Sequence, residues 1–257
     1  MPASGDASAL LGLSGVSKAF GPVQALTDVT LDVPAGAVTA LVGDNGAGKS
    51  TLIKCISGIS PPDAGTISWK GEPARVESPI AANELGIQTV YQDLALCDNL
   101  DIVQNMFLGR ERLRRGQLNE VSMERAAAQT LSDLAVTTVR SVRQLVASLS
   151  GGQRQSVAIA KAVLWKSELV IMDEPTAALG VAQTRMVLDL VRTLVDRGQA
   201  VLLVSHNMID VFEVADRIAV MRHGHLVDVR PASRMSQAIV VDLMTTGETT
   251  RTVEETA

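Results

Sequence analysis

The chain has 257 residues, of which 46% are hydrophobic, and it carries a formal net charge of −5. This composition predicts a folded protein with a sizeable core, either one domain or one domain with a subdomain. The negative charge argues against a protein that grips nucleic acid through a broad basic surface. No apolar run approaches the ~20 residues of a membrane-spanning helix, and the amino terminus lacks a signal-peptide pattern, so we expect a soluble, cytosolic chain.

The expected elements begin with strands in the first forty residues, where apolar and polar positions alternate and a Pro-Ala-Gly turn follows. The middle of the chain is rich in helix formers, with a helix predicted over 122–135, capped by Ser122, and another over 154–165. From residue 168 onward strands and helices alternate, which predicts a mainly parallel sheet with the helical block inserted as a subdomain. The remaining predicted strands are 38–42, 66–71, 169–172 and 200–204, and the remaining helices 51–56, 183–196 and 207–214.

A glycine-rich segment, Gly-Asp-Asn-Gly-Ala-Gly-Lys-Ser at residues 43–50, lies between a predicted strand and a predicted helix. Its glycines let successive backbone N–H groups approach a phosphate, the lysine offers an ammonium to the β- and γ-phosphates, and the serine offers a hydroxyl to Mg²⁺. The alternative is a plain turn between strand and helix. The predicted nucleotide-binding residues are Gly43, Asp44, Asn45, Gly46, Ala47, Gly48, Lys49, Ser50 and Thr51.

Two carboxylates, Asp173 and Glu174, follow the apolar strand at 169–172, at the strand end where ligand sites of parallel sheets collect. Asp173 suits a Mg²⁺ partner opposite Ser50, and Glu174 suits a base that polarises water for attack on a γ-phosphate. The alternative is a pair of acids that only ends a strand before the turn at Pro175.

A second phosphate-binding element is predicted at Ser150, Gly151, Gly152 and Gln153. These residues begin a helix and have the Ser-x-x-Gln spacing of a capping box. The two glycines leave the N-terminal N–H groups of the helix open to an outside anion. Either this segment only starts a helix, or it serves a second nucleotide. A second nucleotide implies a head-to-tail dimer of two copies.

Taken in this order, the motifs resemble the ATP-binding cassette of ABC transporters over about residues 10–245, followed by a polar tail at 246–257. The resemblance implies an α/β P-loop NTPase fold of the RecA-like type. Such a fold has a mainly parallel sheet, an N-terminal antiparallel β segment and an inserted helical subdomain at about 95–160. The implied cofactors are ATP and Mg²⁺, and the implied activity is ATP hydrolysis.

The resemblance also implies roles for three side chains outside these motifs. Gln92 matches the glutamine that senses Mg²⁺ and the attacking water, His206 matches the histidine that contacts the γ-phosphate, and Phe20 lies where an aromatic ring stacks on adenine. Without the resemblance, Gln92 is equally a loop glutamine and Phe20 equally a core phenylalanine, and a lone histidine at a strand end, such as His206, is more often structural. Asp173, Ser50 and Gln92 are then the expected Mg²⁺ ligands.

The chain departs from the family pattern at Gly180, where an aspartate usually communicates across the dimer. Hydrolysis is not thereby excluded, because the residues expected to carry it are all present. Two other histidines, His223 and His225, fit a hairpin turn and receive no functional role.

Within the family, the sequences of residues 90–100, 105–111 and 177–180 are similar to those of bacterial importers of simple sugars. This similarity implies an ATPase subunit that powers uptake of a small solute, a monosaccharide, from the cytoplasmic side of the membrane. The implied partners are a second copy of the chain, an integral-membrane permease and, indirectly, a solute-binding protein, with no nucleic acid. The alternatives are a soluble cassette ATPase acting on DNA or ribosomes, and an exporter cassette.

Overall fold

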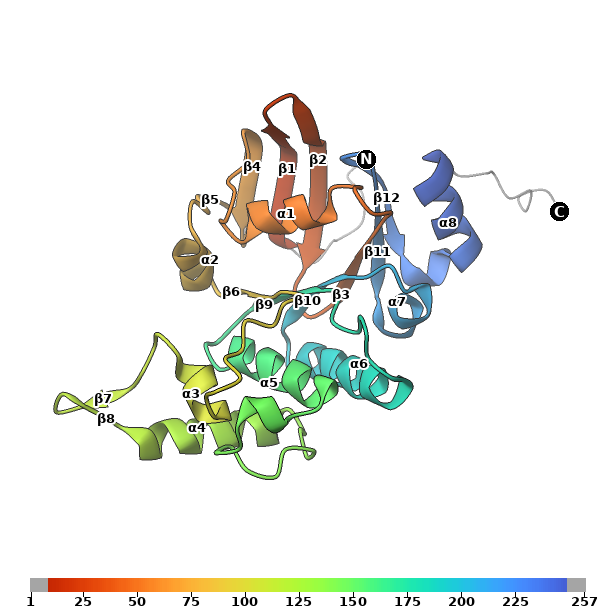
Figure 1. Cartoon of the computed structure of the whole chain (residues 1–257). Coiled ribbons are helices and arrows are strands. Elements are labelled where there is room, and N and C mark those ends of the chain that lie inside the picture. Colours follow the sequence, from red (N-terminus) through yellow and green to blue (C-terminus); the bar gives the residue numbers. More distant parts are fainter. Residues whose placement is uncertain (1–8, 249–257) are drawn as a thin grey trace.

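The computed structural model describes residues 9–248, which form two larger sheets, one small hairpin and eight α-helices (Figure 1). The strands are β1 (Ala9–Phe20), β2 (Val23–Pro34), β3 (Val38–Val42), β4 (Ala64–Trp69), β5 (Glu72–Ala74), β6 (Ile87–Val90), β7 (Leu113–Arg114), β8 (Gln117–Leu118), β9 (Leu169–Asp173), β10 (Ala200–Val204), β11 (Arg217–Arg222) and β12 (His225–Pro231). The helices are α1 (Lys49–Ile56), α2 (Pro79–Leu85), α3 (Ile102–Phe107), α4 (Glu120–Asp133), α5 (Gly151–Val163), α6 (Val181–Asp196), α7 (Met208–Val214) and α8 (Gln237–Thr246).

The central sheet has the strand order β12-β11-β3-β10-β9-β6, and every neighbouring pair is parallel except the antiparallel hairpin of β11 and β12. Strands β3 and β10 are buried along their whole length, which explains why their sequences are continuous apolar runs rather than alternating ones. The predicted parallel sheet is confirmed. Its register brings the carboxyl ends of β3, β9 and β10 to one edge.

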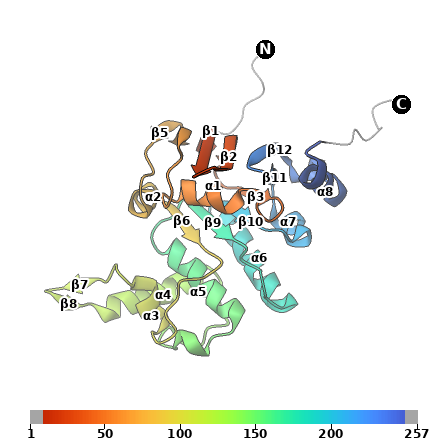
Figure 2. The same ribbon diagram turned by 45° about the horizontal axis from the view of Figure 1, so that its top comes forward.

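Helix α1 is enclosed between two sheets. Figures 1 and 2 show it between the central sheet and the antiparallel sheet β2-β1-β4-β5, while α5 and α6 cover the opposite face of the central sheet. Its apolar side chains, such as Leu52 and Ile56, are fully buried in one core with residues of β1 and β2 such as Leu11 and Leu31. The segment that leads into α1 is therefore attached to a helix held on both sides.

The helical block between β6 and β9 contains α3, α4 and α5. Helix α4 begins at Glu120, so the prediction of Ser122 as its cap is wrong. Asn119 caps instead, because its side-chain Oδ1 accepts from the Ser122 N–H at 3.2 Å. Helix α5 likewise begins at Gly151, three residues before the predicted start.

Arg143 ties the helical block together. Its guanidinium donates to Glu124 at 3.0 Å, to Asp101 at 3.2 Å and to Glu120 at 2.9 Å. These hydrogen bonds, the one to Glu124 first, raise the pKa of Arg143. A single side chain thus joins the start of α3 to two turns of α4.

Both cysteines, Cys55 and Cys97, are free thiols, and Cys55 is buried in α1. Burial raises the pKa of the Cys55 thiol to about 11. Within residues 9–248 no helix is long and apolar enough to cross a bilayer. Of the predicted tail at 246–257, residues 249–257 lie outside the described residues, and α8 reaches Thr246.

Leu202, in the middle of β10, provides a test of the central core. Its side chain is fully buried, so Leu202→Ala removes packed methyl groups and leaves a cavity. We expect the free energy of unfolding to fall by about 2–5 kcal/mol, measured by urea denaturation monitored by circular dichroism. The same change at the half-exposed Leu145 serves as the control and should cost much less; equal losses at both positions would contradict the assigned core.

Candidate functional site

One cavity of about 450 Å³ brings together most of the residues predicted from the separate motifs. It lies where the carboxyl end of β9, the loop before α1 and the β11–β12 turn meet. The predicted residues that line it are Asn45, Gly46, Ala47, Gly48, Lys49, Ser50, Thr51, Gln92, Asp173 and Glu174. Asn45 and Glu174, which are 129 positions apart in the sequence, thus line the same pocket.

The loop at 43–50 has the backbone that a phosphate cradle requires. Gly46 and Gly48 have φ values of 83° and 103°, which residues with a Cβ rarely adopt. The Lys49 ammonium is buried and donates to the carbonyl oxygens of Gly43 at 2.6 Å and Asp44 at 3.0 Å. Burial lowers the pKa of Lys49, and the carboxylates of Glu174, Asp173 and Asp44 act in the opposite direction.

The β11–β12 turn braces this loop from the outside. A Cβ on Gly43 would lie 2.4 Å from the Met221 carbonyl oxygen, so only glycine permits the approach of β11. The Gly224 N–H donates to the Ala47 carbonyl oxygen at 3.0 Å, which ties the turn to the loop. The turn predicted around His223 is confirmed, but His223 also lines the cavity. No motif spacing connects residue 223 with residue 43, so this placement is not evident from the sequence.

The acidic pair ends β9, as predicted. Burial raises the pKa of Asp173, Glu174 adds to that rise, and Lys49 opposes it. Glu174 has a φ of 50°, in the left-handed region, and its N–H donates to the Val204 carbonyl oxygen at 2.9 Å. The β9–β10 pairing therefore fixes the backbone of Glu174 at the edge of the cavity.

The structure also joins Glu174 to His206. Glu174 Oε2 lies 2.9 Å from His206 Nδ1 and accepts from the His206 backbone N–H at 3.4 Å. The Glu174 carboxylate is mostly buried, whereas the His206 side chain is 67% exposed. A carboxylate and an imidazole held in this way can together orient a water molecule.

The expected Mg²⁺ ligands Ser50, Gln92 and Asp173 all line the cavity. A hydroxyl, an amide and a single carboxylate suit a hard cation that takes its remaining ligands from phosphates and water. In the described part of the chain, no cluster of three or more His, Cys, Asp and Glu side chains could hold a metal ion alone. The residues therefore fit a metal that arrives with a nucleotide.

Phe20 lies at the end of β1, and its side chain is 48% exposed. The Lys18 ammonium lies 5.7 Å from its ring centroid. Phe20 is not among the residues lining the 450 Å³ cavity, although Val23, just across the β1–β2 turn, is. Stacking of Phe20 on adenine stays a prediction.

The segment 150–153 starts α5 with the predicted capping box. Gln153 Oε1 accepts from the Ser150 N–H at 2.9 Å, and the Gln153 N–H donates to Ser150 Oγ at 3.4 Å. Gly152 has a packing role that the sequence did not reveal, because a Cβ there would lie 3.0 Å from Gln183 Cβ on α6. None of Ser150, Gly151, Gly152 and Gln153 lines the cavity that contains Lys49.

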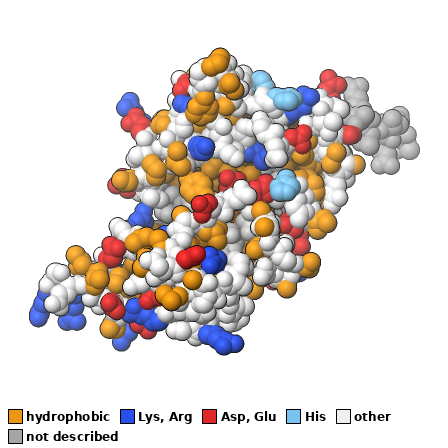
Figure 3. All heavy atoms as spheres, viewed as in Figure 1, with side chains coloured by type: hydrophobic (Ala, Val, Ile, Leu, Met, Phe, Trp, Pro, Cys, Tyr) orange, Lys and Arg blue, Asp and Glu red, His pale blue; other side chains and the backbone are white. Residues whose placement is uncertain are grey.

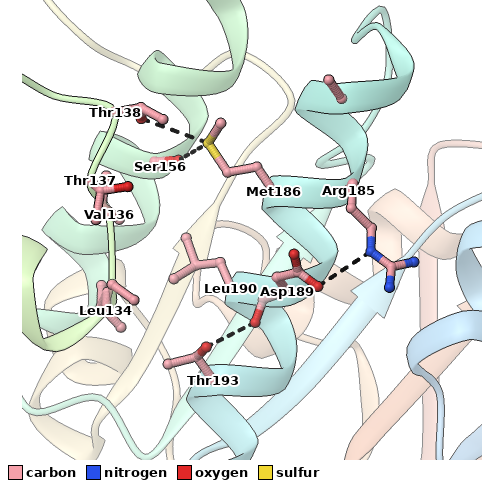
Figure 4. Close-up of a pocket in the computed structure, with 12 residues that line it drawn as sticks. Leu134, Val136, Thr137, Thr138, Ser156, Arg185, Met186, Asp189, Leu190 and Thr193 are labelled. Atoms are coloured by element: carbon pink, nitrogen blue, oxygen red, sulfur yellow. Dashed lines mark hydrogen bonds and ion pairs between the residues drawn. The ribbon is translucent and has the colours of Figure 1, made fainter.

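A smaller cavity of about 340 Å³ separates residues 134–138 from α6 (Figure 4). Met186 of α6 points toward the helical block there, with its sulfur 3.8 Å from Thr138 Oγ1 and 3.6 Å from Ser156 Oγ. The Gln153 side-chain amide donates to the Thr138 carbonyl oxygen at 2.6 Å. The capping-box segment is thereby linked to the contact between the helical block and α6.

Gly180, where the resemblance implied an aspartate, is the N-cap of α6. Its φ of −76° is open to any residue, and a Cβ would meet nothing within 4 Å. The Gly180 N–H donates to Gln183 Oε1 at 3.3 Å. No backbone constraint therefore demands glycine at this position.

Comparisons with known proteins show the family of the chain. Residues 26–177 match the family model described as "ABC transporter". The fructose import ATP-binding protein FrcA of Rhizobium meliloti is 45% identical over 243 residues, covering 92% of this chain and 94% of the relative. The xylose/arabinose import ATP-binding protein XylG of Sulfolobus acidocaldarius is 43% identical over 238 residues, covering 93% and 94%.

A solved structure of MJ1267, an ATP-binding cassette of an ABC transporter, superposes with a TM-score of 0.79 at 25% identity, covering 91% of this chain and 96% of that one. The implied P-loop fold with its mainly parallel sheet is confirmed. The family match and these relatives, together with the phosphate-loop cavity, show that the chain belongs to the ATP-binding cassette family of ABC transporters.

Proposed function

We propose that this chain is the ATP-hydrolysing subunit of an importer that takes up a monosaccharide through a separate membrane permease. One observation carries the ATPase part: Lys49, Ser50, Gln92, Asp173 and Glu174 line the same cavity. The solute class is supported by relatives named as fructose and xylose/arabinose import ATP-binding proteins.

The phosphates of ATP would bind along the loop at 43–50. The backbone N–H groups at its glycines and the start of α1 donate to them, and Lys49 places its charge against the β- and γ-phosphates. Ser50, Gln92 and Asp173 would hold Mg²⁺, which neutralises charge on the phosphates when bound. Phe20 would stack on adenine at the end of β1.

Glu174 would act as the base on the attacking water. Its carboxylate accepts the proton as the water attacks the γ-phosphorus, and the anhydride oxygen leaves with the electron pair of the broken P–O bond. His206, 2.9 Å from that carboxylate, would orient the water and donate to a γ-phosphate oxygen. The hydrogen bond from the Glu174 N–H to the Val204 carbonyl oxygen supports this role, because it would hold the base in position before the nucleotide arrives.

The segment 150–153 would act on the nucleotide of a second copy, because it does not line the cavity of its own chain. This arrangement requires a head-to-tail homodimer with two nucleotides at the interface. ATP would favour the closed dimer by its greater affinity for that state. The helical block would pass the motion to the permease at the cytoplasmic face of the membrane, and a solute-binding protein would deliver the solute on the other side.

The competing class is a soluble cassette ATPase that acts on DNA or ribosomes. To separate the two, the chain would be purified from its native membranes in mild detergent and the accompanying proteins identified. We expect a polytopic permease that, reconstituted in vesicles with the chain and its solute-binding protein, takes up labelled fructose or xylose with ATP. Recovery with ribosomes or DNA in the soluble fraction would move the chain to the other class.

Glu174→Gln tests the proposed base. The amide keeps the shape of the side chain but cannot accept the proton, so ATP binding should persist and hydrolysis should fall about 10²- to 10⁴-fold. Phosphate release and nucleotide affinity are measured on the same preparation. Glu168→Gln, at a surface ion pair with Lys70, is the matched control; turnover near the wild-type rate in Glu174→Gln would remove Glu174 from this role.

Lys49→Ala tests the phosphate loop. The ammonium makes charge-assisted hydrogen bonds, and its loss should weaken ATP binding about 10- to 150-fold, measured by calorimetry. The exposed Lys70→Ala should leave affinity unchanged. An unaltered dissociation constant in Lys49→Ala would contradict the assignment of the cavity.

Gly180→Asp tests the departure from the family pattern. The backbone and the free space admit the side chain, which can also accept from N–H groups at the start of α6, so the melting temperature should stay the same or rise slightly. If the aspartate restores a contact across the dimer, the Hill coefficient of ATP hydrolysis should rise. Gly180→Ala, without the carboxylate, is the control, and identical cooperativity in both variants would show that side-chain coupling at this position is dispensable.

A further inference from the structure

We propose that the hairpin formed by β7 and β8, residues 110–118, binds the anionic lipid headgroups of a membrane surface. Figures 1 and 2 show this hairpin projecting from the outer end of the helical block, away from the phosphate-loop cavity. Every residue from 108 to 118 is exposed. Nothing in the ATPase mechanism uses it.

The hairpin has one apolar face and a basic tip. Leu113 pairs directly with Leu118, which puts both side chains on one face, and Arg114 pairs with Gln117 on the other. Arg115 and Gly116, with φ values of 53° and 79°, form the two-residue turn typical of a tight hairpin. The two leucine side chains are left 65% and 55% exposed.

The charge of this segment is opposite to that of the chain. Residues 110–115 read Arg-Glu-Arg-Leu-Arg-Arg and carry a net charge of +3, whereas the whole chain has a formal net charge of −5. Glu111 accepts from the Gly109 N–H at 3.0 Å, and this hydrogen bond lowers the pKa of Glu111. The basic excess is therefore present with the glutamate ionised.

The four arginines divide into two anchored and two outward-facing ones. The guanidinium of Arg110 lies 5.0 Å from the ring centroid of Trp165, and that of Arg112 lies 5.2 Å from the ring centroid of Phe107. These contacts fix the base of the hairpin on α3 and the end of α5. At the tip, Arg114 and Arg115 form no ion pair or side-chain hydrogen bond with any residue of 9–248.

The combination favours a lipid surface over other anionic partners. Figure 3 shows basic and hydrophobic side chains gathered at this end of the molecule, in the region where Figure 1 places β7 and β8. Arginines can pair with lipid phosphates while the neighbouring leucines enter the headgroup region. A nine-residue hairpin is too small for a protein interface of standard size, and it has no aromatic side chain on which a nucleic-acid base could stack.

The inference goes beyond the proposed function and rests on it only in that a permease would bring the hairpin close to a membrane. The test uses the purified full chain without nucleotide or permease. Flotation with vesicles of phosphatidylcholine alone is compared with flotation on vesicles that also contain phosphatidylglycerol. We expect binding to the anionic vesicles, weakening as salt is added.

R114Q/R115Q should lower the partition coefficient on anionic vesicles about 30-fold. At high salt, where the charges are screened, L113S/L118S should lower the partition coefficient more than R114Q/R115Q does, because the leucines then contribute most of the binding. The matched control is R125Q/R140Q, which removes two exposed arginines from the same helical block and should bind like the wild type. All variants should hydrolyse ATP at the wild-type rate, because none of these residues touches the cavity.

The proposal is overturned if the wild-type chain does not float with anionic vesicles, or if R114Q/R115Q and R125Q/R140Q bind alike. It is also overturned if R114Q/R115Q loses copurification with the permease or with RNA while vesicle binding is unchanged. Failure of the proposed function would instead appear in the hydrolysis and uptake assays, which do not depend on flotation.

Discussion

The site depends on the close approach of backbone to backbone around the phosphate loop. β11 can lie against residue 43 only because Gly43 has no Cβ, and Gly48 likewise admits the Ala25 carbonyl oxygen, 2.9 Å from where a Cβ would be. The hydrogen bond from Gly224 to Ala47 locks this arrangement. A loop so enclosed keeps its N–H groups aimed at the cavity without reorganising when an anion binds, which is the condition for strong electrostatic binding.

The parallel sheet supplies the second half of the chemistry. Because β9 and β10 are paired in register, Asp173 lies beside Val204. Glu174, the first residue after β9, then meets His206, the second residue after β10, beyond the edge of the sheet. Burial that raises the pKa of Asp173 and lowers that of Lys49 puts two opposite charges in one partly dry pocket. Burial disfavours the charged form of each group, and the opposite charge of the other group favours it. A phosphate and its metal would therefore enter a site that already contains charges of both signs.

The helical block shares an apolar core with the central sheet, and a set of specific contacts joins it to α6. Gly152 allows α5 to pack closely on α6, and the sulfur of Met186 contacts Thr138. The Gln153 side chain donates to the Thr138 carbonyl oxygen while it caps its own helix. Gln153 therefore links the end that would meet a second nucleotide to the position of the block. The hairpin at the far end is held by Arg110 and Arg112 on aromatic rings, which leaves its tip free to serve a different surface.

Much of the fold was predictable because its signals are local. The apolar runs of β3, β9 and β10, the glycine spacing at 43–50 and the acids after β9 each occupy a few consecutive residues, and their order alone predicted the parallel sheet and the loop. Helix starts were less predictable, since Asn119 and Ser122 are both good caps and only the folded backbone selects one.

The tertiary structure alone decided the contacts between distant segments. His223 lines the cavity, Gly152 makes room for Gln183, His206 meets Glu174, and Leu113 and Leu118 share an exposed face. None of these follows from spacing, because they depend on which strand lies beside which and on how closely two helices approach. The sequence by itself determined the chemical groups and their local backbone; the packing of the sheets and helices determined which of those groups act together.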